Sequence, residues 1–107
     1  NSTQAADKIE TEAIKEVFGD LAYKIPISAV KSMVGECYSV TAAFNVAAAV
    51  GAICEGFLFP TVNYQEPDPN CDLDYVPNVP REKKLDVVMS NGFGFGGTNG
   101  TLVFRKL

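Results

Sequence analysis

Histidine is absent from all 107 residues, and this removes the commonest general base and the commonest zinc ligand. Basic runs are also absent, and the formal charge is 9 − 13 = −4. Because binding to a phosphate backbone depends on clustered Lys and Arg, nucleic acid is not an expected partner. Any proton chemistry would use carboxylates, Lys, Tyr, Cys or a residue from another chain. We expect no metal and no cofactor.

The three cysteines form no C-x-x-C pair. If Cys37 and Cys54 share one helix, a rise of ~1.5 Å per residue separates them by ~25 Å, which is too far for a disulfide. We therefore expect reduced thiols and a cytoplasmic location. Two triplets resemble glycosylation sites, at residues 1–3 and 99–101, but no signal peptide accompanies them, so they are interpreted as accidental.

One uncharged segment, residues 37–54, just reaches the lower length limit for a membrane span. Its apolar side chains are mostly alanine, which contributes little to transfer into a membrane. Four polar or small residues interrupt it: Ser39, Thr41, Asn45 and Gly51. The segment is predicted to be a buried helix, and no membrane span is expected.

An amphipathic helix is predicted from Asp7 to Phe18. Asp7 to Glu10 has the form of a capping box, and Gly19 can close the helix. Apolar residues recur at helical spacing: Ile9, Ala13, Ile14, Val17 and Phe18. The opposite face is polar and solvent-exposed, with Glu12, Lys15 and Glu16. Residues 23–30 are predicted to form a short strand, at an edge or a strand start because Pro26 cannot donate to a ladder.

A second helix, over residues 38–55, is apolar on every side. One stripe contains Val40, Ala43, Phe44, Ala47, Val50 and Cys54. The other side contains Ala42, Val46, Ala49 and Ile53. Such a helix has to be covered all round, and one further helix and a few strands cannot surround it. The missing cover must therefore come from another polypeptide, and the chain alone is not expected to fold well.

The remaining residues indicate a long loop followed by a β-hairpin. The loop spans residues 63–81, with a brief extended stretch near Asp74-Tyr75-Val76. Strands are predicted at residues 85–90 and 101–105, joined by a glycine-rich turn at residues 92–100. The element order predicts an α/β fold whose sheet is buried between helices.

The segment Gly92 to Gly97 matches G-x-G-x-x-G. This pattern indicates dinucleotide binding only when it opens a helix, and here a strand follows. A hairpin with glycines at positive φ explains it equally simply. The alternation of Phe93 and Phe95 with glycines favours a movable gate over an apolar or acyl ligand.

Several segments, in order along nearly the whole chain, closely resemble the type II β-ketoacyl-acyl-carrier-protein synthases. They are Asp7 to Phe18, Lys31 to Gly35, "FPTVNYQEPDP" at 59–69, "NCDLDYVPN" at 70–78, "NGFGFGGTN" at 91–99 and Thr101 to Phe104. The resemblance implies the C-terminal part of a thiolase-like, layered α-β-α-β-α fold that is normally dimeric. Residues 1–107 would form the C-terminal segment of the family's C-terminal domain, incomplete as a single chain.

The resemblance also assigns the site residues. The family's nucleophilic cysteine lies upstream, so none of the three cysteines takes that role. One family histidine would precede Asn1-Ser2-Thr3. The other follows Lys-Ser-Met-x-Gly, where this chain has Glu36. Lys31 matches the family lysine. Phe93 matches the gating phenylalanine, in a gate loop of Phe93, Gly94, Phe95, Gly96 and Gly97 preceded by Gly92 in place of serine.

A carboxylate at position 36 changes the implied mechanism. The family histidines donate hydrogen bonds to a thioester oxygen during decarboxylation of a malonyl thioester, and losing one such donor costs ~10²–10³ in rate. Glu36 could donate only if desolvation raised its pKa and kept it protonated. The favoured hypothesis is a non-catalytic chain-length factor, which shapes the acyl or polyketide pocket beside an active ketosynthase.

The implied partners are the N-terminal remainder of the subunit, the active ketosynthase and an acyl carrier protein. Tyr38 and Phe44 are candidates for lining the pocket, or they pack in the core. Two alternatives remain. Because the gate sequence is intact, one is a divergent active synthase catalysing decarboxylative condensation of malonyl and acyl thioesters. The other is a small independent interaction module, against which the uncovered helix argues.

Overall fold

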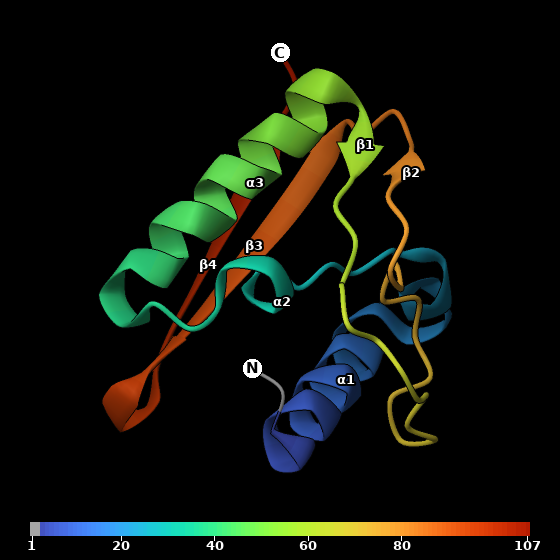
Figure 1. Ribbon diagram of the computed structural model, residues 1–107, viewed down its shortest axis with the longest axis vertical. Helices are drawn as coiled ribbons and strands as arrows, with labels where there is room; N and C mark the ends of the chain where they lie inside the picture. The colour runs from blue at the N-terminus through green and yellow to red at the C-terminus, as the bar shows by residue number, and fades with distance from the viewer. Residues whose placement is uncertain (1–2) are drawn as a thin grey trace.

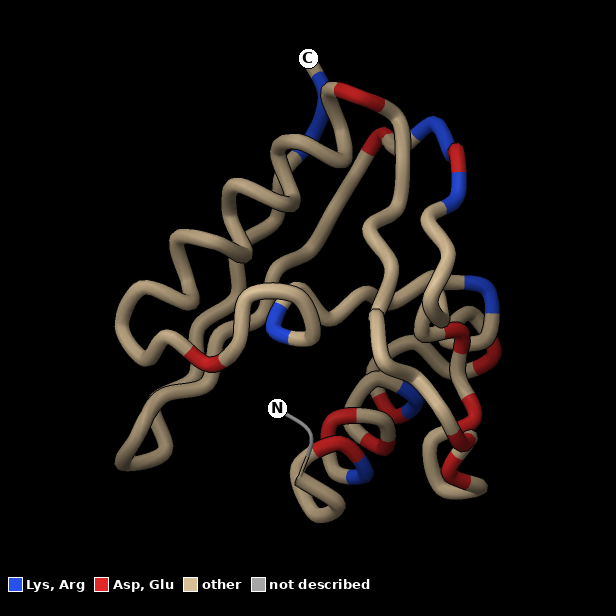
Figure 2. Tube along the Cα trace, viewed as in Figure 1, with Lys and Arg blue, Asp and Glu red and all other residues tan. Residues whose placement is uncertain are grey.

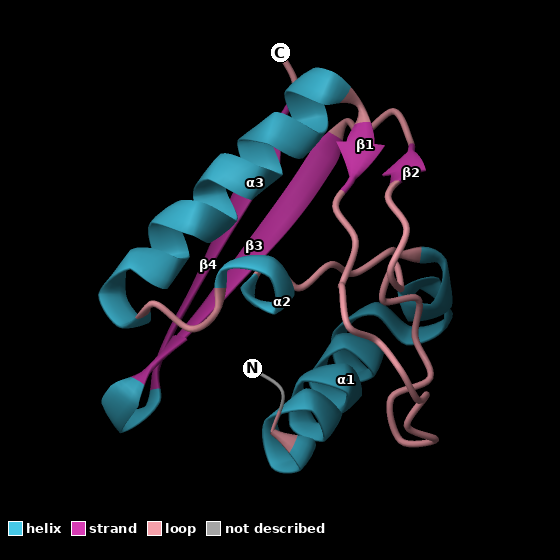
Figure 3. Ribbon diagram, in the orientation of Figure 1, coloured by secondary structure: helices cyan, strands magenta, loops and turns pink. Residues whose placement is uncertain are grey.

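The computed structural model describes residues 3–107 and has three α-helices and two small antiparallel sheets in this part of the chain (Figures 1 and 3). The helices are α1 (Gln4–Phe18), α2 (Lys31–Val34) and α3 (Thr41–Glu55). The strands are β1 (Phe57–Leu58), β2 (Arg81–Glu82), β3 (Val87–Gly94) and β4 (Thr98–Arg105). Short 3-10 helices occur at Gly19–Lys24, Tyr38–Val40 and Phe95–Gly97.

Helix α1 begins three residues before the predicted capping box. Thr3 is the N-cap, and its hydroxyl oxygen accepts a hydrogen bond from the Ala6 amide at 3.3 Å. The prediction of Asp7 as the cap is therefore wrong, because an earlier threonine already caps the first turn. The helix ends at Gly19, with φ of 54°, as the sequence predicts. Asn1 and Ser2, which belong to the triplet aligned with the first histidine motif, lie outside the described residues.

The strand predicted at residues 23–30 does not form. The chain instead continues from α1 into a 3-10 helix that ends at Lys24. In the following extended stretch, the Ile27 amide donates to the Asp74 carbonyl at 2.7 Å. Pro26 has no N–H, and a loop rather than a strand lies opposite, so no ladder develops.

The predicted hairpin is confirmed, and it is longer than predicted. Strands β3 and β4 pair antiparallel from Val87 opposite Arg105 to Gly94 opposite Thr98. The glycine-rich segment therefore belongs mostly to the ladder, and only Phe95–Gly97 forms the turn. Gly96 and Gly97 have φ of 78° and 79°, which side chains with a Cβ adopt only under strain.

Helix α3 lies along one face of the hairpin (Figure 1). Its inner side contributes Ala52 and Ile53 to the core, together with Leu58, Val76 and Leu85, and with Phe59, Val88 and Phe104 packed around them. One of the two apolar sides that the sequence predicted forms an outer stripe, and all of it is exposed in this chain: Val40, Ala43, Phe44, Ala47, Val50 and Cys54. The opposite face of the hairpin is equally open, with Val87, Met89 and Val103 exposed. Both apolar surfaces need a cover that residues 3–107 do not supply.

Charge is distributed very unevenly along the chain. Figure 2 shows acidic and basic residues gathered on α1, on the loop between β1 and β2, and near the C-terminus, while α3 and the hairpin are almost free of them. Among the described residues, the helical stretch Tyr38–Glu55 is long and apolar enough to cross a membrane by length and composition only, and 22% of it is buried. A core helix that lacks its cover has the same properties.

The loop between β1 and β2 supplies a fully buried core residue. The sequence did not predict β1 or β2, because each contains only two residues. Between them, Val76 is fully buried with φ of 48°, an unusual conformation for a β-branched residue. The Asp74 carboxylate accepts from the Val76 amide at 3.1 Å and from the Arg81 guanidinium at 2.6 Å. The predicted extended stretch at residues 74–76 is thus a bent, side-chain-anchored loop rather than a strand.

The same loop attaches helix α1 to the rest of the chain. Thr11, only 2% exposed, shares a hydrogen bond of 2.6 Å with the Tyr75 hydroxyl. One turn along the helix, Lys15 forms an ion pair with Asp72. The apolar residues Ile9 and Val17 of the predicted inner face are exposed. Polar contacts, rather than the apolar stripe, therefore hold α1 within this chain.

Replacing Thr11 with valine in the full-length subunit is expected to lower the free energy of unfolding by about 1–3 kcal/mol, because the partly buried Tyr75 hydroxyl loses its partner. Denaturant titration measures the change. In the matched double variant Thr11→Val/Tyr75→Phe, the loss should be smaller than the sum of the two single losses. Additive losses would show that the two hydroxyl groups do not interact.

Candidate functional site

The candidate site is built on the short connection between α2 and α3. Gly35 ends α2 with φ of 78°, and its amide donates to the Lys31 carbonyl at 2.8 Å. This tight turn brings Glu36 back over the start of α2. The Lys31 ammonium there donates a hydrogen bond to Glu36 Oε2 in an ion pair. The two polar residues that the family resemblance selected are therefore direct partners.

The second oxygen of Glu36 organises the opening of α3. Glu36 Oε1 accepts from the Tyr38 amide at 3.0 Å and from the Thr41 hydroxyl at 2.7 Å. The Thr41 oxygen in turn accepts from the Cys37 amide at 2.9 Å. Thr41 is buried and was missed as a site residue. A threonine at the start of a predicted helix was the available signal, since such residues favour helix N-termini.

These contacts keep Glu36 ionised. The hydrogen bond from Lys31, followed by the bond from Thr41, lowers the pKa of the Glu36 carboxyl to about 2. Desolvation acts in the opposite direction but is outweighed, because 46% of the side chain is exposed. Within this chain, the hydrogen bonds from Lys31 and Thr41 therefore favour the ionised form of Glu36. The alternative of a buried, protonated Glu36 in the full-length subunit stays a prediction.

The Glu36 carboxyl is expected to titrate near pH 2 instead of near its ordinary value of 4.5. A lowered folded-state pKa contributes stability above the unfolded pKa, and this contribution is lost as the pH falls through the folded pKa. Carboxyl ¹³C NMR of protein labelled at glutamate measures the titration. In a Lys31→Met variant the pKa should rise toward the ordinary value, whereas Lys8→Met, which alters an exposed pair with Glu12, should leave it unchanged.

Tyr38 has an unusual backbone for a residue with a side chain. Its φ is 52°, in the left-handed region, which costs about 1–2 kcal/mol for a residue other than glycine. The resemblance implies a usually small, glycine-rich helix opening here, and the positive φ explains why glycine is suited to it. The Tyr38 ring is 71% exposed and lies 6.1 Å from the Phe95 ring, centroid to centroid.

The predicted gate loop lies at the tip of the hairpin, on the same side of the molecule as Glu36. Below the tip, Asn91 is held on both sides: its carbonyl accepts from the Asn45 amide group at 3.3 Å, and its side chain accepts from the Thr101 hydroxyl at 3.0 Å. Phe93 and Phe95 above it are exposed. The base of the loop is therefore anchored to α3, and movement of its tip stays a prediction.

The structure brings together only part of the predicted site. Lys31, Glu36, Tyr38 and Phe95 form one connected cluster. Phe44 lies further along α3 on the exposed stripe, so its assignment to a pocket stays a prediction. In residues 3–107, no group of three or more Cys, Asp or Glu side chains could hold a metal ion.

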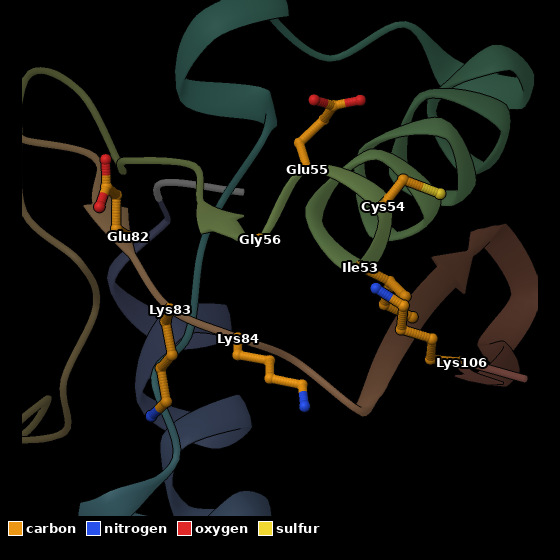
Figure 4. Close-up of a pocket in the computed structure, with 8 residues that line it drawn as sticks. All are labelled: Ile53, Cys54, Glu55, Gly56, Glu82, Lys83, Lys84 and Lys106. Atoms are coloured by element: carbon orange, nitrogen blue, oxygen red, sulfur yellow. The ribbon is translucent and has the colours of Figure 1, made fainter.

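An open hollow occurs at the other end of α3 (Figure 4). It is lined by Ile53, Cys54, Glu55, Gly56, Glu82, Lys83, Lys84 and Lys106. None of the predicted site residues lines this hollow. It is a shallow surface feature and does not enclose a ligand.

Comparison with known proteins identifies the family. The family model for the C-terminal domain of β-ketoacyl synthases matches residues 1–65, more than half of the chain. The chain belongs to the β-ketoacyl synthase family. The resemblance found in the sequence is thereby confirmed at the level of the family, and the match covers α1, α2, α3 and the Lys31–Glu36 pair.

Similar proteins extend the match over the whole chain. Nodulation protein E of Rhizobium meliloti is 53% identical over 105 residues, which are 98% of this chain and 26% of the relative. The 3-oxoacyl-[acyl-carrier-protein] synthase 2 of Coxiella burnetii (strain RSA 493 / Nine Mile phase I) is 52% identical over 106 residues, 99% of this chain and 26% of the relative. The chain thus spans about a quarter of the length of these relatives.

A chain of the ishigamide ketosynthase/chain length factor structure superposes with a TM-score of 0.93 at 39% identity, covering 98% of this chain and 26% of its own length. The thiolase-like α/β fold expected from the resemblance is therefore confirmed for this chain. The exposed stripe of α3 and the open face of the hairpin occur in a chain whose fold matches about one quarter of a larger chain from the ketosynthase/chain length factor structure. This agreement favours a core helix over a membrane span for α3.

Proposed function

We propose that this chain is the C-terminal segment of a chain-length factor, the non-catalytic subunit that shapes the acyl or polyketide pocket beside an active ketosynthase. One observation carries the proposal: Glu36, at the position that the family resemblance assigns to a histidine, is ionised and paired with Lys31. A carboxylate cannot donate a hydrogen bond to a thioester oxygen, and its charge opposes the negative charge that develops there.

The ion pair between Lys31 and Glu36 also supports a structural role for Lys31. The Lys31 ammonium, which the resemblance matches to the family's lysine, here donates to a carboxylate of its own chain. The pair fixes the turn between α2 and α3. A structural role of this kind fits a subunit that supplies shape rather than chemistry.

We propose that the subunit acts in the cytoplasm and has three partners. The first is the N-terminal remainder of the subunit, which would cover the exposed stripe of α3 and the open face of the hairpin. The second is an active ketosynthase, as in the ketosynthase/chain length factor structure that this chain resembles. The third is an acyl carrier protein, which the name of the Coxiella relative includes.

The test is purification of the full-length subunit with every chain that binds it, followed by intact-mass analysis and an assay with malonyl-carrier protein. The proposal expects an active ketosynthase in the complex and no decarboxylation by this subunit alone. Decarboxylation by the purified subunit without a partner would contradict the proposal.

A divergent, active synthase is the second candidate. The intact gate loop at residues 93–97 and the 52% identity to a 3-oxoacyl-[acyl-carrier-protein] synthase favour it. Such an enzyme would condense malonyl and acyl thioesters without a histidine at position 36. The same assay distinguishes the two candidates, because only the active synthase forms a 3-oxoacyl product when no other ketosynthase is present.

A further inference from the structure

The opening of α3 and the tip of the hairpin meet through one aromatic contact. The centroids of the Tyr38 and Phe95 rings are 6.1 Å apart, and their planes are inclined by 30°. This separation lies within the range of attractive aromatic pairs. Tyr38 belongs to the segment that the Glu36 network organises, whereas Phe95 begins the glycine-rich turn. The contact therefore joins two parts of the site that are distant in sequence.

Glu36 determines where the Tyr38 ring lies. The Tyr38 amide donates to Glu36 Oε1, which also accepts from the Thr41 hydroxyl, while Glu36 Oε2 is held by Lys31. Tyr38 has a left-handed φ of 52°, which a residue with a side chain keeps only when its surroundings hold it there. Loss of the carboxylate would remove the hydrogen bond that the Tyr38 amide donates to Glu36 Oε1.

The turn has little else to restrain it. Gly96 and Gly97 both have positive φ, and a Cβ placed on either would meet no atom within 4 Å in the described structure. Phe95 is 88% exposed. The ladder ends at Gly94 opposite Thr98, so the three residues between them lie beyond the paired strands, in a short 3-10 turn.

We propose that Glu36 is a positioning residue that holds the Tyr38 ring against Phe95, so that the two rings latch the turn at Phe95–Gly97. The two rings form an apolar barrier between the first residues of α3 and the tip of the hairpin. An acyl or polyketide chain that passes this tip must displace the two rings or be stopped by them. Tyr38 is thus a specificity-determining residue for chain length, a part of the inference that rests on the proposed function.

The latch is tested by hydrogen exchange, followed by mass spectrometry, in the full-length subunit bound to its ketosynthase partner. In Tyr38→Ala, the amides of residues 93–99 should exchange roughly two- to tenfold faster, because one aromatic contact is lost. Tyr38→Phe should exchange as the wild type does, since the ring remains. Ser39→Ala, at an exposed neighbouring position, is the matched control and should also be unchanged.

The positioning role is tested by Glu36→Ala and by the double variant Glu36→Ala/Tyr38→Ala. If Glu36 acts through Tyr38, both should show the same acceleration at residues 93–99 as Tyr38→Ala alone. Glu36→Gln should stay closer to the wild type, because its amide oxygen can still accept from the Tyr38 amide. Exchange in α1 serves as a reference for general unfolding, and equal exchange there shows that the effect is local.

Unchanged exchange at residues 93–99 in Tyr38→Ala would overturn the latch, and additive effects in the double variant would overturn the positioning role of Glu36. The chain-length role has a separate readout, the length distribution of products from the reconstituted complex. Tyr38→Ala should shift this distribution toward longer chains, whereas Tyr38→Phe should not. Faster exchange with an unchanged distribution would keep the latch and refute its role in specificity. Failure of the proposed function would instead appear as decarboxylation by the subunit alone.

Discussion

Replacing Glu36 with histidine in the full-length subunit is expected to raise the rate of malonyl-carrier-protein decarboxylation by about 10²–10³-fold. Histidine supplies a hydrogen-bond donor where negative charge develops on the thioester oxygen. The change also removes the carboxylate, whose pKa of about 2 keeps it charged at neutral pH. Conversion of the malonyl to the acetyl form of the carrier protein, followed by intact mass, measures the rate.

The matched control is Glu36→Leu, which removes the charge but adds no donor. Its rate should stay far below that of Glu36→His, which separates the effect of the donor from that of lost repulsion. Equal rates in the wild type, Glu36→Leu and Glu36→His would mean that Glu36 is not the reason for inactivity. The missing chemistry would then lie elsewhere in the full-length subunit.

The 107-residue chain alone is expected not to fold cooperatively. Its core is small, and the apolar stripe of α3 and the open face of the hairpin are exposed together. Exposed apolar surface of this kind leaves too little burial to offset the conformational entropy of folding. We expect a broad thermal transition by circular dichroism, strong binding of a hydrophobic dye, and association at micromolar concentration.

The full-length subunit provides the comparison, and it should unfold in a sharp transition without dye binding. A soluble, monomeric 107-residue chain with a sharp transition would contradict the prediction. It would also revive the interpretation of an independent interaction module, because such a module must fold by itself.

Charged substitutions on the outer stripe of α3 extend the test. Val50→Lys should strongly destabilise the full-length subunit, whereas Gln65→Lys, in the exposed loop, should not.

The sequence predicted the elements with strong local signals. Helix α3 and the β3–β4 hairpin have long apolar patterns, and Gly19 marked the end of α1 correctly. Weak local signals failed. The two-residue strands β1 and β2 went unnoticed, and residues 23–30 looked like a strand although, within residues 3–107, only one backbone hydrogen bond, from Ile27 to Asp74, joins them to a neighbouring segment and no ladder forms. Whether a segment forms a strand depends on the backbone that lies opposite it. The residues of that segment alone do not show which backbone that is.

The same division holds at the site. The sequence by itself determined that a carboxylate stands at position 36, that a lysine precedes it at position 31, and that α3 is apolar on every side. Only the tertiary structure decided that Glu36 is ionised, because its pKa depends on the positions of the Lys31 and Thr41 donors. It also decided that Tyr38 meets Phe95, since chain folding alone brings the two rings together.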